Sequence, residues 1–306
     1  MQITPVVISN SLLQTLQTQE AQITQLQQEE ATGQSFQLPS DNPIAAETTL
    51  GLNNSLAQIS SYTAAAQNAQ GWLTQASGSL SGMVSLWDQA MQTATQAANS
   101  TNNQNDLNTM ANSVTQLQAN LGQILNSQYE GTYIFNGYQN QTPPITVTGN
   151  SYPSSVTWSA TTNGQAQTFQ INTTASVTVN LTGWESVGQT AGVNYFAQAY
   201  NDLGALATAI QKGPSAVQAM LPQLQQDMSN LTGAQALAGG RLTRIQNTLD
   251  QLQKASSDLN QSVANVAGAN MAQVTTQLAQ EQVAYQAALQ SGSQILSLSL
   301  LNFINP

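Results

Sequence analysis

The chain contains no cysteine and no histidine, and only 6% of its 306 residues are charged. Without histidine there is no Ser-His-Asp relay, no imidazole base and no imidazole ligand for a metal. Without cysteine there is no thiolate nucleophile, no cysteine-bound zinc and no disulfide. Because most catalytic chemistry depends on these groups, we expect a protein that is not an enzyme and has no metal and no cofactor.

Basic residues are also scarce, and they are confined to one region. The four are Lys212, Arg241, Arg244 and Lys254, whereas residues 1–211 contain ten acidic residues and no basic one. Binding to nucleic acid or to an anionic membrane surface needs clustered positive charge, so we expect neither partner. No segment is long and apolar enough to span a bilayer, and residues 1–5 do not resemble a cleaved signal peptide. The sequence therefore predicts no membrane insertion.

Hydrophobic residues make up 40% of the chain, and most of them recur with helical periods. The first segment has a heptad pattern with one polar member (Leu12, Leu16, Gln19, Ile23 and Leu26), and it stops at Gly33. A loop then leads to Asn42 and Pro43, which suit an N-cap and a first helical position. From Ile44 to about Ala98 one long helix is expected, with the unbroken heptad series Leu52, Ile59, Ala66, Leu73, Leu80, Trp87 and Ala94.

Helical patterns return several times further along the chain. They are predicted over about 107–124 and 194–211, and from Leu221 to Val266. Pro222 is expected in a first turn, with a kink after Ala216 as the alternative. After Gly268 the period changes to eleven residues (Val274, Leu278, Tyr285, Leu289, Leu296 and Leu300). A change of period indicates a different packing environment, so we expect a joint near Gly268.

The segment between these helices is rich in β-branched and aromatic residues and in turn residues. Four short strands are predicted, at Ile145–Thr148, Val156–Ala160, Thr168–Ile171 and Val177–Leu181. No helix has an apolar face broad enough to fold alone. We therefore predict a mainly α protein, an elongated antiparallel coiled-coil bundle formed by both chain ends, with a small β-rich domain inserted mid-chain. The expected divisions are 1–43 with 268–306 (terminal assembly helices), 44–143 with 194–267 (helical bundle) and 144–193 (β-rich outer domain).

Several motifs, in order and in their distances from the ends, resemble those of the flagellin superfamily of bacterial flagella. They are Thr32-Gly33, Pro39-Ser40-Asp41-Asn42-Pro43, Asn68-Ala69-Gln70-Gly71-Trp72-Leu73, Gly240-Arg241-Leu242-Thr243-Arg244-Ile245 and Ser297–Ile304. The segment Gly131–Gly137, followed by Thr142-Pro143-Pro144, is more similar to the hook-associated proteins at the hook–filament junction than to flagellin itself. Two positions depart from the family pattern: Gln34-Ser35-Phe36 replaces basic residues and Ala267–Asn270 replaces an acidic cluster.

This resemblance implies a secreted structural subunit of the flagellum, exported unfolded by the type III route with the help of an export chaperone. Its implied place is between hook-associated protein 1 and the flagellin filament, in contact with further copies of itself. The terminal helices would then pack against neighbouring subunits by coiled-coil contacts. The candidate interface residues are Leu12, Leu16, Ile23, Leu26, Val274, Leu278, Leu289, Leu296 and Leu300.

Two other functions remain open at this point. A flagellin-type filament subunit is the nearer alternative, and a surface binding module or adhesin is the more distant one. An adhesin predicts a ligand-binding surface on the β-rich segment, where the sequence shows no such pattern.

Overall fold

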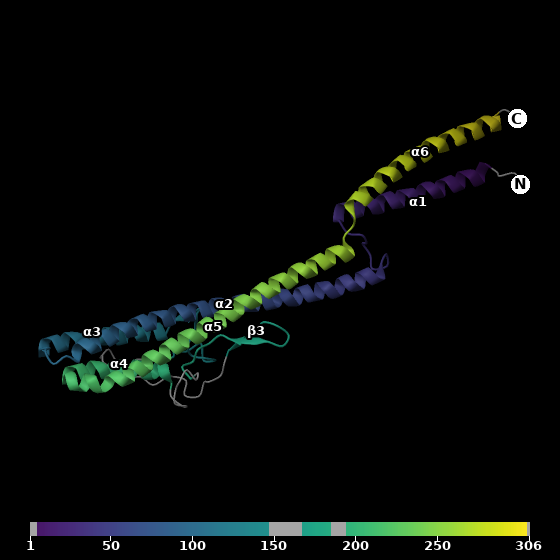
Figure 1. Cartoon of the computed structure of the whole chain (residues 1–306). Coiled ribbons are helices and arrows are strands. Elements are labelled where there is room, and N and C mark those ends of the chain that lie inside the picture. Colours follow the sequence, from purple (N-terminus) through teal and green to yellow (C-terminus); the bar gives the residue numbers. More distant parts are fainter. Residues whose placement is uncertain (1–4, 147–166, 185–193, 305–306) are drawn as a thin grey trace. The chain divides into compact units, whose positions relative to one another are not determined.

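The computed structural model describes residues 5–146, 167–184 and 194–304, and this part of the chain is mainly helical (Figure 1). The helices are α1 (Pro5–Thr32), α2 (Pro43–Ala97), α3 (Gln104–Leu125), α4 (Tyr195–Lys212), α5 (Pro214–Ala267) and α6 (Met271–Ile304). The strands are β1 (Gln128–Tyr129), β2 (Thr132–Tyr133), β3 (Thr168–Gln170) and β4 (Ser176–Thr178). Long helices near both chain ends with small sheets between them confirm the predicted fold class.

Polar caps fix where the helices begin, because the first backbone N–H groups of a helix have no partner within it. At the start of α2, the Asn42 side chain accepts a hydrogen bond from the N–H of Ala45 at 3.1 Å, as predicted. Asn103 forms a capping box with Asp106 at the start of α3, and Asn194 caps α4. Gly213, with φ +111°, ends α4 immediately before Pro214 begins α5.

The described chain forms two compact units. We call Met1–Ile59 with Ala255–Pro306 the terminal unit, and Ser60–Lys254 the central unit. Helices α2 and α5 contribute residues to both. The domain limits expected from the sequence follow a different, threefold scheme, and that scheme stays a prediction.

The central unit contains the hydrophobic core. The heptad residues Ala66, Leu73, Leu80, Trp87 and Ala94 of α2 are fully buried in it. The indole N–H of Trp87 donates to the carbonyl of Leu224 on α5 at 2.9 Å. The Gln118 amide on α3 donates to the carbonyl of Tyr200 on α4 at 3.0 Å. These two buried bonds satisfy polar groups between helices that are far apart in sequence.

The described part of the β-rich segment packs on this helical core. Ile171, Val177, Val179 and Leu181 are buried in the same cluster as the helices. Arg241 on α5 donates to the carbonyl of Asn180 at 2.9 Å and so ties the segment to the helix. Strands β3 and β4 form an antiparallel pair.

Several sequence predictions need correction here. The predicted strands Thr168–Ile171 and Val177–Leu181 correspond to the shorter β3 and β4, while Val156–Ala160 lies outside the described residues. Ile145 is not in a named strand. It forms an isolated β-bridge, and residues 147–148 of that predicted strand lie outside the described residues. The backbone of Ile145 also exchanges hydrogen bonds with the side chain of Asn126.

Helix α5 begins earlier than its heptad pattern indicated. It starts at Pro214, so Pro222 lies inside the helix and the prediction of a first-turn position is wrong. Proline inside a helix removes one backbone hydrogen bond. Pro222 itself is exposed, while Val217 and Leu224 on the same helix are buried, so α5 packs on the core on both sides of the proline.

The hairpin β1–β2 was not predicted. Its two turn residues, Glu130 and Gly131, have φ values of +50° and +77°, the left-handed region that a tight two-residue hairpin turn requires. Asn-Gly is the usual sequence for such a turn, because both residues readily adopt a positive φ. In Glu130-Gly131 only the glycine has that preference. Behind the hairpin, a Cβ atom at Gly71 of α2 would collide with the side chain of Tyr129.

The uneven burial along α2 yields a testable prediction. Leu52 and Leu73 occupy the same heptad position, but Leu73 is fully buried in the central unit and Leu52 is half-buried in the terminal unit. We expect Leu73→Ala to lower the free energy of unfolding by about 2–5 kcal/mol and Leu52→Ala to lower it clearly less. Chemical denaturation followed by circular dichroism measures both. Equal losses would contradict the assignment of the core to the central unit.

Candidate assembly surface

Helices α1 and α6 of the terminal unit lie side by side and run antiparallel (Figure 1). The residues that face each other show the direction. Gly292 near the end of α6 packs on Leu12 near the start of α1, because a Cβ atom at Gly292 would collide with the Leu12 side chain. Nearer the other end of the pair, Leu26 and Glu29 share a groove with Gln277. The two chain ends are therefore paired along most of their length.

Short segments join this helix pair to α2 and α5, and they are hydrogen-bonded to each other. Gln34 and Gly268 form an antiparallel bridge. The N–H of Ser35 donates to the carbonyl of Ala267, and the N–H of Ala269 donates to the carbonyl of Gly33, each at 2.8 Å. We call this pair of bridged segments the joint. The helix break between α5 and α6 lies near Gly268 as expected, whereas the change in packing environment there stays a prediction.

The rest of the α1–α2 loop is organised by Asp41. Its carboxylate accepts hydrogen bonds from the backbone N–H groups of Leu38 at 2.9 Å and Gln37 at 3.2 Å. These bonds, the one from Leu38 first, lower the pKa of Asp41, because they stabilise the charged form. Asp41 is thus a turn residue.

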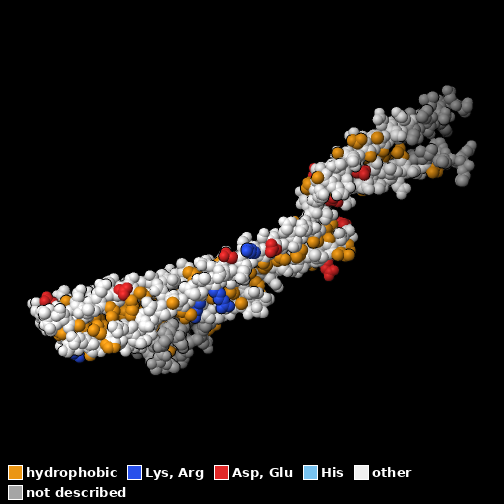
Figure 2. All heavy atoms as spheres, in the orientation of Figure 1, with side chains coloured by type: hydrophobic (Ala, Val, Ile, Leu, Met, Phe, Trp, Pro, Cys, Tyr) orange, Lys and Arg blue, Asp and Glu red, His pale blue; other side chains and the backbone are white. Residues whose placement is uncertain are grey.

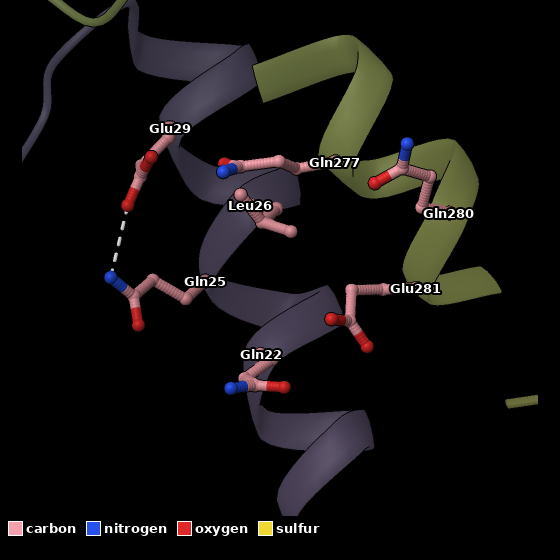
Figure 3. Close-up of a pocket in the computed structure, with 7 residues that line it drawn as sticks. All are labelled: Gln22, Gln25, Leu26, Glu29, Gln277, Gln280 and Glu281. Carbon is pink, nitrogen blue, oxygen red and sulfur yellow. Dashed lines mark hydrogen bonds between the residues drawn. The ribbon is translucent and has the colours of Figure 1, made fainter. Parts of the chain in front are cut away.

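The groove between α1 and α6 is lined mainly by uncharged polar side chains. It has a volume of about 390 Å³ and is lined by Gln22, Gln25, Leu26, Glu29, Gln277, Gln280 and Glu281 (Figure 3). Gln25 donates to Glu29 at 2.9 Å along α1, while Leu26 points from α1 toward α6. A second groove on the α1–α6 pair also contains several glutamines. Its lining residues are Glu20, Ile23, Thr24, Gln27, Gln282, Tyr285 and Gln286. Glutamine amides can both donate and accept, so these walls can bond to a neighbouring protein without charge pairing.

The helix pair buries few of its apolar residues. Among the described residues of the terminal unit, the buried hydrophobic side chains are Ala45, Ala267, Val274 and Leu278. Eight large hydrophobic side chains of this unit are between 41% and 78% exposed: Val7, Leu13, Leu38, Ile44, Leu50, Met271, Val283 and Leu289. Figure 2 shows hydrophobic side chains at the surface along α1 and α6. In the central unit, Tyr138 alone among the described residues is a large hydrophobic of this exposed class. We call the eight residues the apolar surface set.

The apolar surface set does not form a single narrow stripe. Val7 and Leu13 are six residues apart on α1, as are Val283 and Leu289 on α6. At about 100° per residue, two such positions lie about 120° apart around a helix. Each helix therefore presents apolar side chains in more than one direction, which suits contact with more than one neighbour.

The structure divides the interface residues predicted from the sequence. Val274 and Leu278 are buried, 4% and 8% exposed, and Leu12, Leu16, Ile23 and Leu26 are half-buried, so these six already contribute to packing within the terminal unit. Leu289 is 46% exposed. The side chains of Leu296 and Leu300 lie outside the described residues. Whether any of the nine also contacts another subunit stays a prediction.

Sequence reasoning missed the other seven residues of the apolar surface set. Leu13 is adjacent to the heptad residue Leu12, and Ile44 and Leu50 fall outside the α2 heptad series. Such residues are apolar but lie outside the heptad positions, so a regular period does not identify them.

Two further searches concern the described part of the chain. It contains no group of three or more acidic side chains placed to hold a metal ion. None of its helices is long and apolar enough to cross a membrane.

Comparison with known proteins points in one direction. Residues 3–140 match the bacterial flagellin N-terminal helical region. The chain is 24% identical to flagellar hook-associated protein 3 of Escherichia coli over 88% of this chain and 89% of that protein. It is also 24% identical to the protein of the same name from Salmonella typhimurium, over 92% of each chain.

Solved structures share the fold. A putative flagellar hook-associated protein from Vibrio parahaemolyticus aligns with a TM-score of 0.64 at 19% identity, over 74% of this chain and 100% of that chain. The flagellar junction protein FlgL from Legionella pneumophila aligns with a TM-score of 0.52 at 14% identity, over 74% and 100%.

The joint can be tested by adding one methyl group. A Cβ atom at Gly268 would collide with the carbonyl oxygen of Ala264, which is fixed in the last turn of α5. We expect Gly268→Ala to break the bridge to Gln34 and to speed amide hydrogen exchange at Ser35 and Ala269. Gly240→Ala is the matched control, since a Cβ there meets open space. Unchanged protection at both amides in Gly268→Ala would contradict this account of the joint.

Proposed function

The chain is a homologue of flagellar hook-associated protein 3 that carries the flagellin N-terminal region, and from this premise we propose that it joins the hook side of the bacterial flagellum to the filament. It is a structural protein and not an enzyme. The homology over about nine-tenths of the chain is the observation that carries the proposal. The place of action is outside the cell, at the hook–filament junction.

The two units support different parts of this function. The central unit contains the hydrophobic core. The terminal unit buries few apolar side chains and exposes many, so its α1–α6 pair gains most from neighbours. Exposed apolar surface of this kind typically marks a protein-binding region, and each side chain that becomes fully buried contributes about 1.5–3 kcal/mol.

The partners of this chain are other components of the flagellum, and the identity of each partner is part of the proposal. We take them to be hook-associated protein 1 on one side, flagellin on the other and further copies of this chain around the ring, with an export chaperone before secretion. The proposed contact residues are the apolar surface set together with the seam residues Leu12, Leu16, Ile23, Leu26, Val274, Leu278, Leu296 and Leu300. The β-rich segment, 144–193, is the proposed outer domain.

A deletion strain tests the function directly. Cells without this gene should assemble hooks but no filaments and should release flagellin monomers into the medium, because the filament would have no junction on which to start. Electron microscopy of the cells and analysis of the medium give the result. Normal filaments in the deletion strain would overturn the junction assignment. If the deletion strain instead carries hooks with completed junctions and releases no flagellin into the medium, the alternative of a filament subunit is favoured.

Complementation of that strain tests the assembly surface. We expect the double variant Leu13→Gln, Val283→Gln to be secreted and to fold as a monomer, since both side chains are exposed, yet to restore few or no filaments. Tyr138→Gln is the matched control, because Tyr138 is equally exposed but lies in the central unit; it should restore filaments fully. Full restoration by the double variant would remove these two residues from the proposed interface without affecting the homology.

A further inference from the structure

A pair of aspartates occupies the contact between α4 and α5. Asp227 on α5 is 0% exposed, and Asp202 on α4 is half-buried. The two carboxyl groups lie within hydrogen-bonding reach of each other, and neither Oδ2 atom has a hydrogen-bond partner among the described residues. An ionised carboxylate can only accept hydrogen bonds, so a bond between two carboxyl groups requires a proton on one of them.

The surroundings of the pair support this reading. The Oδ2 atoms of both aspartates are shielded from solvent, and no other group in the described chain donates to them. The Oδ1 atom of Asp227 accepts a long hydrogen bond, 3.5 Å, from the side-chain amide of Gln223. One shared proton would satisfy both Oδ2 atoms, whereas two negative charges in this dry contact would repel each other strongly.

No positive charge compensates the pair. The other charged residues on the helices of the central unit are Asp88 on α2, Asp106 on α3, Lys212 on α4, and Arg241, Arg244, Asp250 and Lys254 on α5. Asp88 and Asp106 are exposed. Arg241 is fourteen residues from Asp227, about 21 Å along a helix. None of these groups is among the causes of the raised pKa of Asp227, whereas Asp202 is.

We propose that Asp202 and Asp227 form a proton-sharing clasp that holds α4 against α5, so that folding of the central unit takes up a proton and is favoured by acidity. Burial raises the pKa of Asp227 from 3.8 to about 9, and the charge of Asp202 and the hydrogen bond with it act in the same direction. The clasp is separate from the assembly surface and does not depend on the proposed function.

The sign of the pH effect follows from these pKa values. Below about pH 4 the folded and the unfolded chain both carry the proton, and the clasp contributes fully. Between about pH 4 and about pH 9 the unfolded chain releases the proton and the folded chain keeps it. Because folding takes up one proton in this window, the folding equilibrium constant falls about tenfold for each unit by which the pH rises. Above about pH 9 the folded pair ionises and the clasp is lost.

The test compares the full chain with Asp227→Asn by chemical denaturation from about pH 4 to about pH 9. Asparagine keeps the size and can still donate to Asp202, but it needs no proton. As the pH rises, the ratio of the folding equilibrium constant of the original chain to that of the variant should fall by up to about tenfold per pH unit. Asp250→Asn, on the same helix but exposed, is the control and should run parallel to the original chain. Parallel curves for Asp227→Asn and the original chain would overturn the proposal.

A second measurement keeps the proposal testable if Asp227→Asn does not fold. Infrared spectroscopy of the original folded chain at neutral pH should show the carbonyl band of one protonated carboxyl group, and that band should disappear on unfolding. Absence of the band from the folded chain at neutral pH would show that both aspartates are ionised and that no proton is shared.

Discussion

The pairing of the two chain ends is the contact on which the terminal unit depends. At the joint, Ser35 and Ala267 are hydrogen-bonded although they are 232 residues apart in sequence. Closing so long a loop costs conformational entropy, and the few buried side chains of α1 and α6 offset little of it. The central unit, with its dense core, brings α2 and α5 together and so returns the chain to the joint. The joint therefore forms at a larger entropic cost than a contact between neighbouring segments.

The division between a well-packed unit and a sparsely packed one has a functional consequence. A helix pair that buried all of its apolar side chains internally would have no apolar surface left for neighbours. Here Val274 and Leu278 are buried within the pair, while Leu13 and Val283 remain exposed. Glutamine-lined grooves beside them add hydrogen-bonding groups without charge. Such a surface suits association that must not depend on matching charges, which this chain could hardly supply with four basic residues.

Much of the fold was predictable because it depends on local patterns. The Asn42-Pro43 start of α2 was predicted from single residues whose conformational preferences are strong. The β1–β2 hairpin was not, because Glu130 gives no warning of a positive φ. Pro222 was misplaced because a local rule disfavours proline in helix interiors, whereas α5 starts eight residues earlier, at Pro214.

The sequence by itself determined the helices, their periods, the charge distribution and the absence of histidine and cysteine chemistry, since each of these follows from residues close together in the chain. It could not distinguish Leu52 from Leu73, which share a heptad position, or Asp227 from Asp250, which share a helix. Burial decides the role of each of these residues, and burial is the sum of contacts with segments that are distant in sequence. Only the tertiary structure brings α4 to Asp227 and α6 to α1, and so only it separates the core from the surface left for partners.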